Sequence, residues 1–165
     1  MEVREAQRPL KQRYREDPSA AHITLHATGA QSDTPIACSV EVGRAIHEAQ
    51  AHQGVGGAGT AACSGDMLLG ALAACAQVTC QMVASAMGIT TSRIEVRVDG
   101  DLDLRGTLGV DPDTPVGFQS IRLDFDVDAP GADADAISKL KEKTTRYCVV
   151  LATLNHPPAV DVTWS

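Results

Sequence analysis

The residues best suited to chemistry in this sequence are five cysteines, because a thiolate can act as a nucleophile, a metal ligand or half of a disulfide. They are Cys38, Cys63, Cys75, Cys80 and Cys148. The number is odd and no two of them form a C-x-x-C pair, whereas the disulfide scaffold of a small secreted protein usually carries an even set. The N-terminus has no apolar run that would indicate a secretory signal. We therefore expect free thiols in a reducing cytoplasm.

Three of these cysteines have informative surroundings. Cys75 lies in a stripe of small and apolar residues at three- and four-residue steps, where a buried structural thiol is the simplest interpretation. Cys80 follows five positions later, about 140° around the same helix, so these two cannot form a disulfide. Cys148 follows Arg146 and opens a short apolar run, where a helix N-terminus and a guanidinium would both favour its thiolate. The pattern leaves open whether Cys75 and Cys148 meet.

A long helix must position Cys75. The run from Met67 to Thr91 contains no charged residue. It predicts a buried helix that is capped by Ser64 or Asp66 and stops at Gly88. The run has the length of a membrane span, but it contains polar side chains and lacks basic flanks, so we expect a core helix and no membrane partner.

The other elements are strands and a second helix. Strands are predicted in residues 20–42 (two runs forming a hairpin), 92–106, 117–129 and 159–164, and an amphipathic helix in residues 132–146. Residues 43–65 are expected to be a Gly-rich connection. Strands interrupted by two separated helices indicate an α+β fold. We expect an N-terminal arm over residues 1–18 and a single domain over residues 19–165.

The charge and the aromatic content exclude some partners. The 165-residue chain carries a net charge of −7 and only five aromatic residues. Nucleic acids and anionic membranes attract a positive face, and single-stranded nucleic acids stack on aromatic side chains. We therefore expect no nucleic-acid partner.

A glycine motif and the histidines lack the context that their chemistry needs. Gly54, Gly56 and Gly59 complete a G-x-G-x-x-G pattern, but no acid lies in the charge-free run that follows, where a dinucleotide site needs one. His47 and His52 are five residues apart, where the zinc motif H-E-x-x-H needs four. We therefore expect neither a dinucleotide nor a metal.

Two segments together resemble the OsmC/Ohr superfamily of thiol peroxidases. They are SGDMLLGALAACAQVTC at 64–80 and RYCVVLATL at 146–154. The resemblance extends over about residues 20–164. It implies an OsmC-like fold: an N-terminal β-hairpin, a long buried central helix, further antiparallel strands and a second helix. It also implies an intertwined homodimer with active sites at the dimer interface.

The same resemblance implies a reaction. Cys75 would be the thiolate that attacks an organic hydroperoxide, giving an alcohol and a sulfenic acid. Cys148 would resolve this acid as a Cys75–Cys148 disulfide, which a dithiol of the lipoyl type would reduce. No metal or organic cofactor is needed. The alternatives are a weakly or non-catalytic relative that binds a small apolar ligand at the dimer interface, and a redox sensor that oxidises without turning over.

Two positions depart from the family's pattern. The family's helix-opening acid is commonly Glu, and the matching residue here is Asp66. It lies nine residues before Cys75, about 13.5 Å along one helix. It would therefore serve the Cys75 of the partner subunit, and a helix cap is the alternative role. The family's catalytic arginine lies near the hairpin turn, which has none here. Arg44 is our substitute, and the other candidates are Arg13, Arg15 and Arg146.

Overall fold

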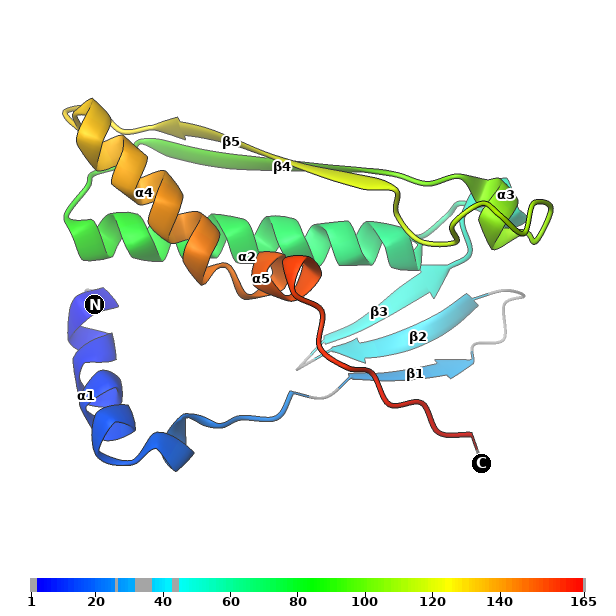
Figure 1. The fold of residues 1–165 in the computed structure, drawn as a ribbon, viewed down its shortest axis with the longest axis horizontal. Helices are drawn as coiled ribbons and strands as arrows, with labels where there is room; N and C mark the ends of the chain where they lie inside the picture. Colours follow the sequence, from blue (N-terminus) through cyan, green and yellow to red (C-terminus); the bar gives the residue numbers. More distant parts are fainter. Residues whose placement is uncertain (1–2, 26, 32–36, 43–44, 165) are drawn as a thin grey trace. The chain divides into compact units, whose positions relative to one another are not determined.

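The computed structural model describes residues 3–25, 27–31, 37–42 and 45–164 (Figure 1). The helices are α1 (Val3–Glu16), α2 (Ser64–Met87), α3 (Leu104–Thr107), α4 (Ala134–Tyr147) and α5 (Val149–Asn155), with short 3₁₀ helices η1 (Pro18–Ala21) and η2 (Gln53–Val55). The strands are β1 (Ala27–Gln31), β2 (Ala37–Val42), β3 (Ala45–Gln50), β4 (Arg93–Asp101) and β5 (Ser120–Asp128). The chain forms two compact units, one of residues 1–7, 71–98 and 123–165 and one of residues 8–70 and 99–122.

Strands β1, β2 and β3 form an antiparallel sheet in the order β1-β2-β3. The predicted hairpin is confirmed, but β1 begins only at Ala27. Residues 18–21 form η1, which Asp17 caps through the Ser19 N–H, and residues 22–25 have no regular secondary structure. We expected residues 43–65 to be an irregular connection, but residues 45–50 of this segment form strand β3. The buried amide of Gln50 fixes the end of β3, since it donates to Glu48 and accepts from Thr60.

Helix α2 has a well-defined start and end. The Cys63 N–H donates to the Asp66 carboxylate (2.9 Å), and the Asp66 N–H contacts the Cys63 sulfur (3.5 Å). This is a capping-box arrangement, so Cys63 is the cap and our choice of Ser64 or Asp66 is wrong by one to three residues. The predicted stop is confirmed. Gly88 has φ 71°, and Ile89 donates to the Ala84 carbonyl (2.9 Å), as in a Schellman motif.

Strands β4 and β5 form a two-stranded sheet. Bonds from Ser92 to Asp128 (2.9 Å) and from Gln119 to Asp101 (2.8 Å) close its two ends and make it antiparallel. Both strands alternate exposed and half-buried residues, as their sequence pattern predicts. The predicted strand over residues 92–106 is wrong beyond Asp101, because the Asp103 side chain accepts from Arg105 and starts α3.

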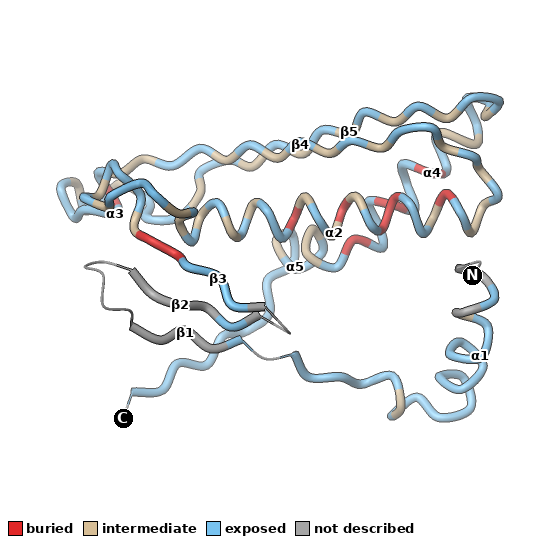
Figure 2. Tube along the Cα trace, turned by 180° about the vertical axis from the view of Figure 1, so that it is seen from behind, coloured by how far each residue is buried: buried red, intermediate tan, exposed pale blue. Residues whose placement is uncertain are grey.

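The core of the first unit lies where α4 crosses the C-terminal part of α2 (Figure 1). Asp133 caps α4 through the Ala136 N–H (2.8 Å), so the predicted amphipathic helix is confirmed. Cys80 and Ala84 of α2 pack against Leu140 of α4, and partly buried residues of β4 and β5 complete the cluster. Figure 2 shows buried residues in both helices.

The C-terminal segment is not a strand. Residues 156–164 have no regular secondary structure, so the prediction of a strand over residues 159–164 is wrong for the single chain. Val160, Val162 and Trp164 are 80%, 71% and 92% exposed. The alternating pattern is that of a strand, but a strand forms only when an adjacent edge supplies its hydrogen bonds.

Within the described residues, α2 is the one helix with the length and composition of a membrane span; its mean hydropathy is 1.6. About a third of the apolar window is buried. A core helix of a globular protein meets the same criterion.

Candidate functional site

Cys75 and Cys148 lie in contact, although 73 positions separate them in the sequence. Cys75 is half-buried in the middle of α2. Cys148 is fully buried at the junction of α4 and α5. The Cys148 thiol donates a hydrogen bond to the Cys75 sulfur. The Thr79 hydroxyl, one helical turn further along α2, lies 4.0 Å from that sulfur.

The end of α4 places Cys148 at this point. Leu140, Thr144 and Cys148 are all buried and follow one another at four-residue steps on one face of the helix. Cys148 then leaves the helix with φ −72° and ψ 107°. Its N–H donates to the Thr144 carbonyl (3.1 Å), and its carbonyl accepts from Ala152 (2.9 Å). One residue therefore ends α4 and begins α5, which confirms the prediction of a short helix opening at Cys148.

The surroundings of Cys75 favour its thiolate. Burial opposes ionisation of the thiol. The backbone N–H groups of Val150 and Val149, the Cys148 thiol and the Thr79 hydroxyl together outweigh this effect, so the pKa of Cys75 lies below its ordinary value. Val149 and Val150 are the first two residues of α5. Their N–H groups have no acceptor within the helix, so the thiolate satisfies donors that would otherwise need water.

The surroundings of Cys148 have the opposite effect. Burial raises the pKa of Cys148, and the adjacent Cys75 sulfur raises it further, while the N–H groups of Leu151 and Val150 lower it less. The expectation that the start of α5 and Arg146 favour the Cys148 thiolate is therefore wrong. The N–H groups of α5 do lower the pKa of Cys148, but burial outweighs them, and the Arg146 guanidinium lies over the Tyr147 ring, 5.6 Å from its centroid.

The pair thus combines one sulfur whose pKa is lowered with one whose pKa is raised. A thiolate that hydrogen-bond donors stabilise can attack an electrophile without a separate base. A neighbouring thiol that keeps its proton can later attack the oxidised sulfur and form a disulfide. The arrangement is suited to two-electron redox chemistry on a small molecule.

We predict that Cys75 reacts with iodoacetamide at lower pH than an ordinary cysteine, because only the thiolate reacts and the pKa of Cys75 is lowered. Initial rates measured against pH, with the adduct located by fragment-ion mass spectrometry, should have a midpoint below that of an unstructured cysteine peptide, about 8.5. Cys148 is the internal comparison, and its profile should lie at higher pH because its pKa is raised. A Cys75 midpoint at or above that of the peptide would contradict the assignment.

The structure does not bring Asp66 to Cys75 within one chain. The pKa of Asp66 is lowered by hydrogen bonds from the Cys63 backbone and side chain, with a smaller contribution from His52. These bonds serve the start of α2. Arg44 lies outside the described residues. In the described part of the chain, the groups that lower the pKa of Cys75 include no arginine.

The other candidates lie elsewhere. Arg13 and Arg15 are exposed in the last turn of α1. Cys63 caps α2 and Cys80 belongs to the core. Among the described residues, no group of three or more His, Cys, Asp or Glu side chains is arranged to hold a metal ion.

The sequence analysis missed three contributors to the site, the backbone N–H groups of Val149 and Val150 and the Thr79 hydroxyl. The predicted start of α5 was a usable signal for the two N–H groups. The sequence did not show which of the two sulfurs these N–H groups would face.

One comparison with known proteins identifies a family. The model of the OsmC-like protein family matches residues 57–163. No curated protein sequence matches the chain.

Solved structures share the fold. An OsmC-like protein from Mycoplasma pneumoniae has 18% identity and a TM-score of 0.67, with 82% of this chain and 89% of that chain covered. An organic hydroperoxide resistance protein from Elizabethkingia anophelis has 19% identity and a TM-score of 0.60, with 82% and 91% covered. The organic hydroperoxide resistance protein OhrB of Bacillus subtilis has 19% identity and a TM-score of 0.52, with 81% and 93% covered. The predicted α+β fold, with a long central helix and antiparallel strands, is confirmed.

Proposed function

The chain belongs to the OsmC-like protein family, and from this premise we propose that it is a thiol-dependent peroxidase that reduces organic hydroperoxides to alcohols. Cys75 is the nucleophile and Cys148 the resolving thiol. The family includes organic hydroperoxide resistance proteins among its solved structures.

One observation carries the proposal: two touching cysteines have pKa values shifted in opposite directions. A structural pair of buried thiols would both be neutral, because burial raises the pKa of each. N–H groups at the start of α5 act on both sulfurs, but only at Cys75, where the Cys148 thiol and the Thr79 hydroxyl add to them, do the hydrogen bonds outweigh burial. The half-buried position of Cys75 also leaves it within reach of a small substrate.

The proposed reaction has three steps. The Cys75 thiolate attacks the terminal oxygen of the hydroperoxide; an S–O bond forms, the O–O bond breaks, and the leaving alkoxide takes up a proton to give the alcohol. The Cys148 thiol then attacks the sulfenic sulfur, forming the disulfide and releasing water. A dithiol of the lipoyl type supplies two electrons and two protons by thiol–disulfide exchange and restores both thiols.

The test is turnover of cumene hydroperoxide by the reduced full-length chain with dihydrolipoamide as the reductant. Many equivalents of cumyl alcohol per chain support the proposal. If no cumyl alcohol forms, the proposal is wrong. A single equivalent that stops while dithiol is still in excess would overturn the peroxidase assignment in favour of a redox sensor.

We also propose that the protein acts as a homodimer joined along α2. The outer face of α2 in the first unit carries small and apolar residues at three- and four-residue steps: Ala71, Ala74, Val78, Met82 and Ser85. Val78 is 53% and Met82 39% exposed. Such spacing is typical of a helix that packs against a second helix. A second copy of the chain would cover this face.

The dimer would allow Asp66 to act on the Cys75 of the partner subunit, with Arg44 as the assisting cation. We predict that Met82→Glu gives monomers in sedimentation velocity, whereas Met82→Leu stays dimeric, because a buried unpaired carboxylate opposes association. Asp66→Asn should change the reaction rate of Cys75 with hydroperoxide in the dimer and leave it unchanged in the Met82→Glu monomer. An equal effect of Asp66→Asn in both backgrounds would contradict action across subunits.

A further inference from the structure

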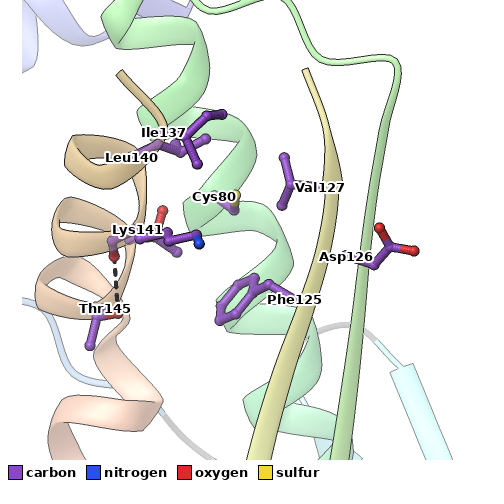
Figure 3. Close-up of a pocket in the computed structure, with 9 residues that line it drawn as sticks. Cys80, Phe125, Asp126, Val127, Ile137, Leu140, Lys141 and Thr145 are labelled. Carbon is purple, nitrogen blue, oxygen red and sulfur yellow. Dashed lines mark hydrogen bonds between the residues drawn. The ribbon is translucent and has the colours of Figure 1, made fainter. Parts of the chain in front are cut away.

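A cavity beside α4 is lined by neither Cys75 nor Cys148. It has a volume of about 280 Å³ and lies among α2, α4 and β5. Its apolar wall consists of Phe125 and Val127 from β5, Ile137 and Leu140 from α4, and the Cys80 side chain (Figure 3). All of these residues belong to the same compact unit.

Two polar groups of α4, the Thr144 hydroxyl and the Lys141 amino group, line the same cavity. The Thr144 hydroxyl is buried and, among the residues that the structure describes, has no hydrogen-bond partner of normal geometry. The Cys80 thiol lies close enough to interact with it, but sulfur is a weak acceptor. A buried hydroxyl without a partner is costly, which makes it a point where a ligand gains affinity.

Lys141 supplies a positive charge beside this hydroxyl. Its amino group extends into the space between α4 and β5 (Figure 3). In the described part of the chain Lys141 has no ion pair, whereas Lys139 is paired with Asp135 at 2.6 Å. The acidic side chain at the cavity, Asp126, points away from it and pairs with Arg93 at 2.6 Å. The net charge available to a ligand is therefore positive.

We propose that this cavity binds a medium-chain monocarboxylate. The hydrocarbon chain lies against Phe125, Val127 and Ile137, and the carboxylate accepts hydrogen bonds from the Thr144 hydroxyl and the Lys141 amino group. These two residues are three positions apart on α4, so both reach one carboxylate. An apolar pocket with a few convergent polar groups is the usual form of a small-molecule site.

The volume sets the length of the chain. At about 30 Å³ per non-hydrogen atom, the share of one water molecule in the liquid, the cavity holds on the order of nine to ten such atoms. Octanoate has about that size. Longer acids would have to extend out of the cavity into solvent.

The test is isothermal titration calorimetry of the reduced full-length protein with octanoate, without any hydroperoxide, so that it is independent of turnover. We expect saturable binding with one site per chain. Lys141→Gln should weaken the affinity about tenfold through loss of a charge-assisted hydrogen bond. Lys143→Gln, which removes the same charge from a residue outside the cavity, should leave the affinity unchanged.

Further variants and ligands separate the contributions. Thr144→Val preserves the shape of the side chain and should also weaken binding, and Ile137→Phe should abolish it by filling the cavity, with circular dichroism as the check on folding. Octan-1-ol should bind more weakly than octanoate. Absence of saturable octanoate binding, equal affinity for octan-1-ol, or equal effects of Lys141→Gln and Lys143→Gln would each overturn the proposal.

Discussion

Replacing Cys75 with serine is expected to lower the turnover of organic hydroperoxides at least about a thousandfold. The geometry gives the reason. The donors at the start of α5 stabilise a sulfur anion at this position, whereas a serine hydroxyl remains protonated at any pH at which the protein is folded. The measurement is the steady-state rate of cumyl alcohol formation with saturating dihydrolipoamide.

Cys63→Ser is the matched control for this variant. It removes one thiol from the same helix, at the cap of α2, and serine is itself a good capping residue. We expect its turnover to stay within about twofold of the wild type. Turnover by Cys75→Ser near the wild-type level would show that another thiol, or no thiol, performs the reaction.

Replacing Cys148 with serine should have a different kinetic effect. The first oxidation still occurs, so one equivalent of alcohol forms per chain in a rapid burst. Steady-state turnover then falls by at least about 100-fold, because an intramolecular attack is replaced by a bimolecular one. Cys75 should accumulate as a sulfenic acid that dimedone traps, detected as a mass increase on the intact protein.

The serine variant also separates two roles of Cys148. A serine hydroxyl still donates a hydrogen bond to the Cys75 sulfur, so the burst rate should change little. Cys148→Ala removes the donor as well and should slow the burst. Sustained turnover by Cys148→Ser without a dimedone adduct would contradict the resolving role.

Local signals predicted much of the fold. Gly88 ends α2 because only its positive φ allows the closing hydrogen bonds, and Asp133 begins α4 by capping it. Strand β3 was missed because its sequence, AIHEAQ, has a weak alternation. Burial of Gln50 depends on a bond to Thr60, ten residues later, which no local pattern contains. The strand predicted over residues 159–164 lacks a partner edge within one chain.

The sequence pointed to Cys75 and Cys148 as the residues of the candidate site, but it did not predict the directions in which their pKa values are shifted. The resemblance assigned roles to Cys75 and Cys148, and the helical spacing separated Cys75 from Cys80. The direction of the first N–H groups of α5 is a tertiary property, because it depends on where α4 ends relative to α2. For this reason the local sequence around Cys148 favoured a thiolate there, whereas the pKa is raised at Cys148 and lowered at Cys75.

The four-residue steps from Leu140 through Thr144 to Cys148 limit how the length of this chain can change. One residue inserted into α4 after Leu140 would rotate Cys148 by about 100° around the helix axis and direct its thiol away from Cys75. Leu140 would keep its place in the core, but the buried Thr144 would rotate together with Cys148. Insertions in the loop between α3 and β5 rotate neither cysteine. Natural length variation compatible with the Cys75–Cys148 contact is therefore expected in that loop and excluded from the second half of α4.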